Sequence, residues 1–146
     1  MKLQRGLADS SGRIYRRFLR LESRANMERA SILVVDDEPA FLRMLTTAVR
    51  LLGYEPISAP TAEAALEVLS EKQPSLIVTD VRLPGMDGIA LARAIKSSIA
   101  TPVLLMSAYG RPPAHEGDGF IGKPFQLDEL SAAIGECIQA ADAPPN

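Results

Sequence analysis

The sequence contains no tryptophan, one cysteine (Cys137) and an aromatic fraction of only 5%. A single cysteine excludes a disulfide within the chain and a zinc site built from several cysteine thiolates. No apolar run approaches the roughly 20 residues that a membrane span requires. Aliphatic side chains must therefore supply the core, and 47% apolar residues suffice for one in a chain of 146 residues. We expect a cytoplasmic protein with a single folded domain.

Positive charge is scarce in most of the chain and concentrated at its beginning. Residues 1–30 hold eight Lys or Arg against three Asp or Glu, a net charge of +5, whereas residues 31–146 carry −7. The acidic part argues against nucleic acid as its main partner. Three interpretations of the basic extension stay open: a disordered arm or marginal helix, a helix for a membrane surface or partner, or a segment before a true start at Met27. We expect residues 1–26 to be dispensable for folding and for the activity of the rest of the chain.

Short apolar runs alternate with amphipathic stretches from residue 31 to residue 141. The apolar runs predict buried strands at residues 31–35, 55–59, 76–78, 102–106 and 120–121. Helices are predicted from Pro39, after Thr61, from about Asp87, and over a final stretch. The apolar face of that final helix is predicted to consist of Leu127, Leu130, Ile134 and Ile138. Strands that alternate with helices predict a parallel sheet covered on both faces.

Polar side chains follow the predicted strands at the points where the strands end. Asp36 and Asp37 follow the first strand, Asp80 the third, Ser107 the fourth and Lys123 the last. The carboxyl ends of parallel strands share one edge of the sheet, where ligands bind. Three crowded carboxylates repel unless a cation joins them, and oxygen ligands with room for water suit Mg²⁺. Together with a hydroxyl and an amine, they predict phosphoryl chemistry with a carboxylate nucleophile.

These residues lie in motifs that identify a family resemblance. The motifs are Val-Val-Asp-Asp-Glu-Pro (34–39), Thr-Asp-Val-Arg-Leu-Pro-Gly-Met-Asp-Gly (79–88), Leu-Met-Ser-Ala (105–108) and Lys-Pro-Phe (123–125). From residue 31 to about 140, the chain resembles the receiver domain of two-component response regulators. The resemblance implies a flavodoxin-like α/β fold with strand order 2-1-3-4-5.

The resemblance also implies roles for the acidic residues. Asp80 would accept a phosphoryl group from a histidine kinase or a phosphotransfer protein. Asp36 and Asp37 would bind Mg²⁺ together with Asp80 and the backbone carbonyl of Arg82. The resemblance therefore implies one phosphoacceptor and one cofactor, Mg²⁺.

Further roles follow from the same resemblance. Ser107 would bind a phosphoryl oxygen and act in the switch, and Lys123 would pair with the phosphate. Phe120 falls at the position of the switch aromatic residue, and the Lys123-Pro124 bond is expected to be cis. Partners would be the phosphoryl donor and an unknown downstream protein, with no direct DNA binding expected.

Two side chains are placed to control how long the phosphoryl group persists. Arg82 lies two residues after the acceptor, and Tyr109 two residues after Ser107; in the family these positions influence self-dephosphorylation. Arg82 stays protonated and cannot act as a base, and a phenol with a pKa of about 10 is a poor base near neutrality. We expect a comparatively long-lived phosphorylated form.

The chain departs from the family pattern between Ser107 and Lys123. Only fifteen residues separate them, which is shorter than the family pattern, and no helical stripe is present. The fourth helix is therefore predicted to be shortened or missing, and residues 109–119 to be the most mobile part of the domain. The predicted organisation is a basic extension over 1–30, a receiver domain over 31–141 and a tail over 142–146.

Other functions remain as alternatives. A phosphatase of the haloacid-dehalogenase type would need a second aspartate two residues after the nucleophile, where this chain has Arg82. A pseudo-receiver would bind proteins without phosphorylation, and the presence of Asp37, Asp80, Ser107 and Lys123 argues against it. We expect a self-phosphorylating and self-dephosphorylating regulator, not a turnover enzyme.

Overall fold

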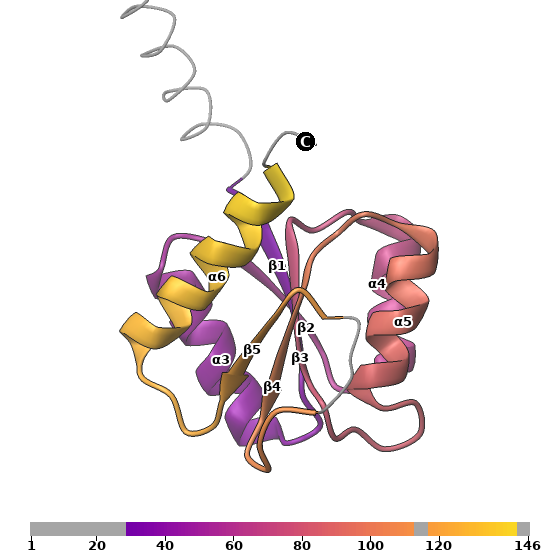
Figure 1. Ribbon diagram of the computed structural model, residues 1–146, viewed down its shortest axis with the longest axis horizontal. Helices are drawn as coiled ribbons and strands as arrows, with labels where there is room; N and C mark the ends of the chain where they lie inside the picture. The colour runs from indigo at the N-terminus through magenta and orange to yellow at the C-terminus, as the bar shows by residue number, and fades with distance from the viewer. Residues whose placement is uncertain (1–28, 113–116, 143–146) are drawn as a thin grey trace, which may run out of the picture.

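Five parallel strands form the centre of the molecule, and helices cover both faces of the sheet (Figure 1). The computed structural model describes residues 29–112 and 117–142. The strands are β1 (Ser31–Val35), β2 (Glu55–Ala59), β3 (Leu76–Asp80), β4 (Val103–Ser107) and β5 (Gly119–Gly122). Their order across the sheet is β2-β1-β3-β4-β5, which confirms the predicted flavodoxin-like fold.

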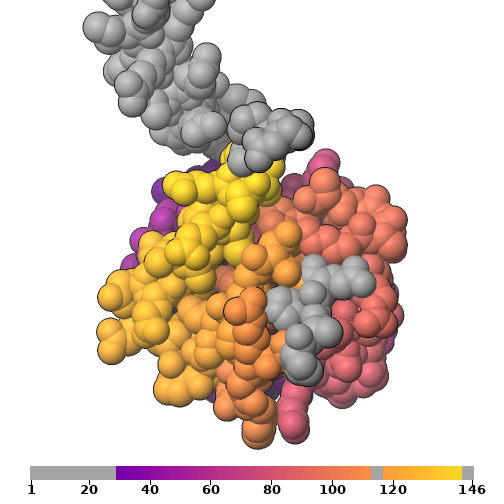
Figure 2. All heavy atoms as spheres, viewed as in Figure 1, coloured from indigo at the N-terminus to yellow at the C-terminus, as the bar shows by residue number. Residues whose placement is uncertain are grey.

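Two helices pack on each face. Helices α3 (Pro39–Leu51) and α6 (Leu127–Asp142) cover one face, and α4 (Ala62–Glu71) and α5 (Gly88–Ser98) cover the other (Figure 1). In the space-filling view, α6 in yellow and α5 in salmon lie on opposite sides of the molecule (Figure 2). Central strands β1 and β3 are buried on both faces, and seven of their ten residues are accordingly aliphatic. The side chains of alternate residues enter opposite core clusters. The core therefore consists of two aliphatic layers separated by the sheet.

Side-chain caps and special backbone conformations fix the helix ends. The Thr61 hydroxyl accepts a hydrogen bond from the Ala64 N–H at 3.0 Å, and the Asp87 carboxylate accepts one from the Ala90 N–H at 2.8 Å. Such caps contribute about 0.5–2 kcal/mol each. Gly53, at a φ of 96°, follows the end of α3 in the left-handed region that glycine tolerates best.

The connection between β4 and β5 contains no helix in its described residues, 108–112 and 117–118. Asp118 ties its end to the fold: its carboxylate accepts a hydrogen bond from the Val103 N–H at 2.8 Å and forms an ion pair with Lys96 on α5. A fourth helix that is shortened or missing was predicted from the short segment, and the described residues of the connection agree with that prediction. The predicted mobility falls partly on residues 113–116, which lie outside the described residues.

One core prediction is wrong. Leu127 was assigned to the apolar face of the last helix, but it is 45% exposed. It is the first residue of α6 and precedes the turns that pack on the sheet, whereas Leu130 and Ile134 are buried as predicted. Cys137, which was not assigned to the core, is buried there instead.

The predicted ends of the chain fall mostly outside the described residues. Of the basic extension only residues 29 and 30 are described, and of the tail only residue 142. Among the helices that the structure describes, none combines the length and apolar character needed to cross a membrane.

Candidate functional site

Three aspartates converge at the carboxyl edge of the sheet. Asp36 and Asp37 follow β1, and Asp80 ends β3, the strand that pairs with β1 in parallel. Each of the three offers a carboxylate oxygen, and these oxygens lie within 4.8 Å of one another. Asp36 is buried, Asp80 half-buried and Asp37 exposed. The cluster is therefore anchored in the core on one side and open to water on the other.

Lys123 joins two of these aspartates. Its ammonium nitrogen lies 2.8 Å from Asp36 Oδ2 and 2.8 Å from Asp80 Oδ2. Its backbone N–H donates to the Ser107 carbonyl at 2.8 Å, which fixes the residue where β5 ends. The Lys123-Pro124 bond that follows is cis, as predicted. The end of the sheet thus places one positive charge between two negative charges.

Burial and pairing shift the ionisation of this cluster. Burial raises the pKa of Asp36; hydrogen bonds from Lys123 and from the Glu38 N–H oppose that shift without cancelling it. For Lys123, burial lowers the pKa, but hydrogen bonds to Asp36 and Asp80 outweigh burial and leave the pKa above its ordinary value. Near neutrality Lys123 is therefore fully charged, and it offsets the repulsion between the carboxylates.

The donor set fits a hard divalent cation. Asp36, Asp37 and Asp80 offer only oxygen, which Mg²⁺ prefers over nitrogen and sulfur donors. Because Asp37 is exposed, a cation bound here would keep contact with solvent, as suits a metal that retains several waters. A metal of this kind would offset the carboxylate charge that Lys123 compensates only in part.

Arg82 contacts the candidate acceptor through its backbone and Tyr109 through its side chain. The Arg82 N–H donates to Asp80 Oδ1 at 3.1 Å, and its guanidinium carbon lies 3.9 Å from the centroid of the Tyr109 ring. The Tyr109 N–H donates to Ser107 Oγ at 3.0 Å. The loops after β3 and β4 are therefore linked across the carboxyl edge. The proposed role of the Arg82 carbonyl as a metal ligand stays a prediction.

The predicted switch residues, Ser107 and Phe120, lie near the aspartate cluster and not in it. Ser107 is buried at the end of β4, and among the described contacts its hydroxyl accepts from Tyr109. Phe120 pairs with Leu105 across β4 and β5, and it is half-buried against the hydrophobic core beneath α4 and α5. Both side chains therefore lie on the same face of the sheet. Their roles in a switch stay predictions.

One neighbour of Lys123 was missed from the sequence. Phe41, in the first turn of α3, lies beneath the ammonium, with the Lys123 nitrogen 3.9 Å from the ring centroid. In the sequence, Phe41 is one apolar residue of an amphipathic helix, and its spacing carries no signal of a contact with Lys123. Only the packing of α3 beside the end of β5 brings the two together.

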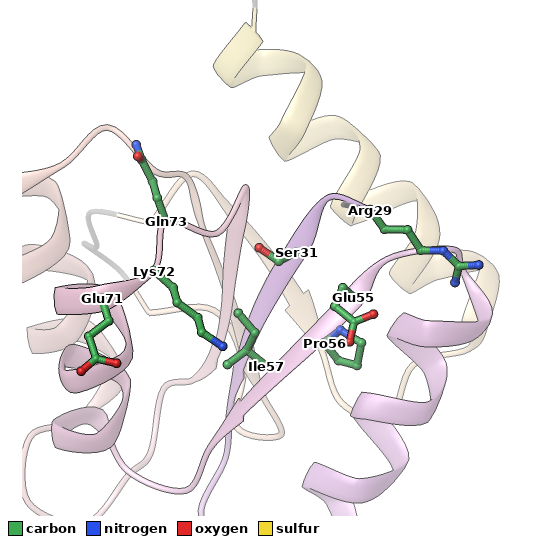
Figure 3. Close-up of a pocket in the computed structure, with 8 residues that line it drawn as sticks. All are labelled: Arg29, Ser31, Glu55, Pro56, Ile57, Glu71, Lys72 and Gln73. Carbon is green, nitrogen blue, oxygen red and sulfur yellow. The ribbon is translucent and has the colours of Figure 1, made fainter. Parts of the chain in front are cut away.

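A separate depression lies at the opposite edge of the sheet (Figure 3). Arg29, Ser31 and Glu55 line it near the starts of β1 and β2, and Lys72 and Gln73 line it after α4. In Figure 3 the Arg29 and Gln73 side chains extend away from each other at its two ends. Its polar groups do not converge on one point, so the aspartate cluster remains the candidate site.

Comparisons with known proteins converge on one family. The family model described as the response regulator receiver domain matches residues 32–135. The probable transcriptional regulator ycf27 of Pyropia yezoensis is 36% identical over 121 residues, which cover 79% of this chain and 50% of that protein. The regulatory protein AtoC of Escherichia coli is 37% identical over 115 residues, or 74% of this chain and 25% of that protein. The chain thus spans half or less of the length of these relatives.

Solved structures agree with the sequence comparisons. The response regulator TrrA of Thermotoga maritima, solved in complex with Mg²⁺ and BeF, has a TM-score of 0.70 and 30% identity over 76% of this chain and 99% of that chain. The receiver domain of a signal transduction histidine kinase from Syntrophus aciditrophicus has a TM-score of 0.72 and 27% identity over 80% of this chain and 96% of that chain.

Proposed function

Because this chain belongs to the response regulator receiver family, we propose that Asp80 accepts a phosphoryl group from a histidine kinase or a phosphotransfer protein. One observation carries the proposal: a single ammonium, that of Lys123, bridges Asp80 and Asp36 beside the exposed Asp37. If Asp80 only capped a loop, it would not need an ammonium that bridges it to a second carboxylate. A nucleophile, a cation and an acidic metal-binding pair are the groups that phosphoryl transfer to a carboxylate requires.

In the proposed step, a carboxylate oxygen of Asp80 attacks phosphorus and forms a phosphorus–oxygen bond. The bond from phosphorus to the donor imidazole nitrogen breaks, and its electron pair returns to that nitrogen. Mg²⁺, held by Asp36, Asp37 and Asp80, would supply positive charge for the phosphoryl oxygens. Lys123, which contacts both Asp36 and Asp80, supplies a second positive charge, and Ser107 offers a hydroxyl as a hydrogen-bond donor.

We further propose that the product is a signal and not the start of a turnover cycle. The acyl phosphate would persist until water removes it, and it would change the surface that a downstream protein binds. The two relatives are named as a probable transcriptional regulator and a regulatory protein, and this chain matches only part of each. That this chain acts by protein contact without binding DNA itself stays a prediction.

Beryllofluoride, which mimics a phosphoryl group on aspartate, tests this function directly. With Mg²⁺ present, we expect ¹H–¹⁵N spectra of the full chain to shift around Asp80, Ser107 and Lys123. Shifts beyond those that Mg²⁺ alone produces should be absent when either Mg²⁺ or beryllofluoride is omitted, and also in Asp80→Asn. A wild-type spectrum that does not respond to the two together would instead identify a pseudo-receiver, a binding module without phosphoryl chemistry.

A further inference from the structure

The ammonium of Lys123 contacts an aromatic ring as well as two carboxylates. Its nitrogen lies 3.9 Å from the centroid of the Phe41 ring, well inside the roughly 6 Å range of a cation–π contact. The Lys123 side chain is only 15% exposed, so water competes weakly for the ammonium. An attraction of this kind strengthens as water is removed.

A second ring braces Phe41. Phe125, two residues after Lys123, meets Phe41 edge to face, with the centroids 6.0 Å apart and the planes at 84°. Both rings are half-buried and pack against the core cluster beneath α3 and α6. The Phe41 ring is therefore held between the core and the segment that carries the lysine.

The ring differs from the other partners of Lys123 in one respect. An ammonium has three N–H donors, and carboxylates of Asp36 and Asp80 accept from two of them. Both carboxylates would change partners in the proposed reaction, because Asp36 would bind Mg²⁺ and Asp80 would become an acyl phosphate. The face of Phe41 binds neither a metal ion nor a phosphate oxygen, so it remains available to the ammonium throughout.

We propose that Phe41 is a positioning residue that holds the Lys123 ammonium at the acceptor site through its ring face. This inference rests on the proposed function, since its consequence is the placement of positive charge beside the phosphoryl group. A simpler explanation is that the ring only fills space between α3 and β5. The two differ in what they require: the first needs the electron density of the ring face, the second only its volume.

Fluorinated phenylalanines at position 41 separate these explanations. Fluorine withdraws electron density from the ring face with little change in size, so Mg²⁺-dependent labelling of the full chain by acetyl phosphate should slow stepwise with fluorine number. Phe41→Leu should slow labelling by roughly fivefold to thirtyfold, and Phe41→Tyr should restore it. The same analogues at Phe125 are the matched control and should slow labelling less, because that ring contacts Phe41 and not the ammonium. Equal rates across the series at Phe41, or equal slowing at Phe125, would overturn the inference.

A spectroscopic signature tests the contact apart from the reaction rate. Protons over a ring face are shielded by its ring current, so the Lys123 ε-methylene protons should resonate upfield in wild type and lose that shift in Phe41→Leu. The shift should survive addition of Mg²⁺ and beryllofluoride. Its loss in that complex would show that Phe41 releases the lysine and would contradict the inference alone. Wild-type protein that never labels would refute the proposed function and this inference together.

Discussion

The guanidinium of Arg82 lies on the ring of Tyr109, with 3.9 Å between the guanidinium carbon and the ring centroid. Arg82 is the second residue after the proposed acceptor Asp80, and its N–H also donates to Asp80 Oδ1. Tyr109 is 73% exposed, so this pair of side chains lies at the surface beside Asp80 and not in the core. We expect a water that attacks the phosphoryl group to approach past these two side chains.

Loss of this contact should shorten the life of the phosphorylated form. A cation–π pair at an exposed site contributes about 0.5–1 kcal/mol, which corresponds to about twofold to fivefold faster decay if the pair blocks water. We expect Arg82→Asn and Tyr109→Glu each to accelerate decay, and the double variant to decay faster than wild type. The measurement is the decay of purified phosphorylated protein. Arg43→Asn, on the exposed side of α3, is the control, and a double variant as slow as wild type would rule out this role.

Gly88 should tolerate no side chain. An added Cβ would lie 2.1 Å from the Asp80 backbone oxygen and 2.9 Å from the Val81 Cα, and neither backbone atom moves without disturbing the loop after β3. We expect Gly88→Ala to lower the free energy of unfolding by about 2 kcal/mol or more. Gly135→Ala in α6 is the control, since nothing lies within 4 Å and the change should stabilise by about 0.5–1 kcal/mol. Urea unfolding measures both, and equal stabilities of the two variants would contradict the predicted clash.

Cys137 should be unreactive in the folded protein. It is 4% exposed, and burial, with Asp118 and Glu136 nearby, raises the pKa of its thiol from 9.0 to about 11. The thiolate is the nucleophile, so a thiol reagent at pH 8 should modify the protein only after urea unfolds it. Rapid modification of the native protein at that pH would contradict the assigned burial.

The raised pKa of the Cys137 thiol also predicts how the unfolding free energy depends on pH. Between about pH 9 and pH 11 the thiol of Cys137 ionises in the unfolded chain but not in the folded one, so its contribution to the unfolding free energy is lost as pH rises. At about 1.4 kcal/mol per pKa unit, the loss is roughly 2–3 kcal/mol. Cys137→Ala should show a correspondingly flatter decline over this range; identical slopes would contradict the raised pKa.

As pH is lowered, Mg²⁺ affinity should begin to fall at a higher pH than it would if Asp36 had the pKa of an ordinary aspartate. Burial raises the pKa of Asp36 above 3.8, and a metal binds the carboxylate and not the acid. Below that pKa the affinity should drop by about tenfold per pH unit. Calorimetric Mg²⁺ titrations across pH, with Asp36→Asn as control, measure this affinity; an affinity that stays constant down to about pH 4 would contradict the prediction.

The contribution of Asp36 to folding stability has the opposite pH dependence. A raised pKa favours the folded state at low pH and does so less as pH rises.

The sequence predicted those features that depend on chain order and periodicity. Asp36, Asp37 and Asp80 could be placed together because each follows a buried apolar run and parallel strands end on one edge. Lys123 could be placed there for the same reason. Thr61 and Asp87 were recognised as helix starts because their side chains suit N-caps.

Features that depend on packing between elements could not be predicted. The contacts of Phe41 with Lys123, and of Arg82 with Tyr109, depend on how a helix or loop lies against a distant strand end. Leu127 was misplaced for a related reason: helical spacing defines a face but does not show where the sheet beneath it stops. Strand order and spacing therefore placed the three aspartates and Lys123 together, but did not predict that Phe41 contacts Lys123 or that Arg82 contacts Tyr109.

Phosphorylation of Asp80 is the central claim, and mass spectrometry of the full chain tests it most directly. After incubation with acetyl phosphate and Mg²⁺, wild-type protein should gain the mass of one phosphoryl group, and peptide sequencing should place it on Asp80. Asp80→Asn should gain none, while Asp87→Asn, which keeps an N-cap residue at the start of α5, should label like wild type. Full labelling of Asp80→Asn, or no labelling of wild-type protein, would contradict the assignment of Asp80 as the phosphoacceptor.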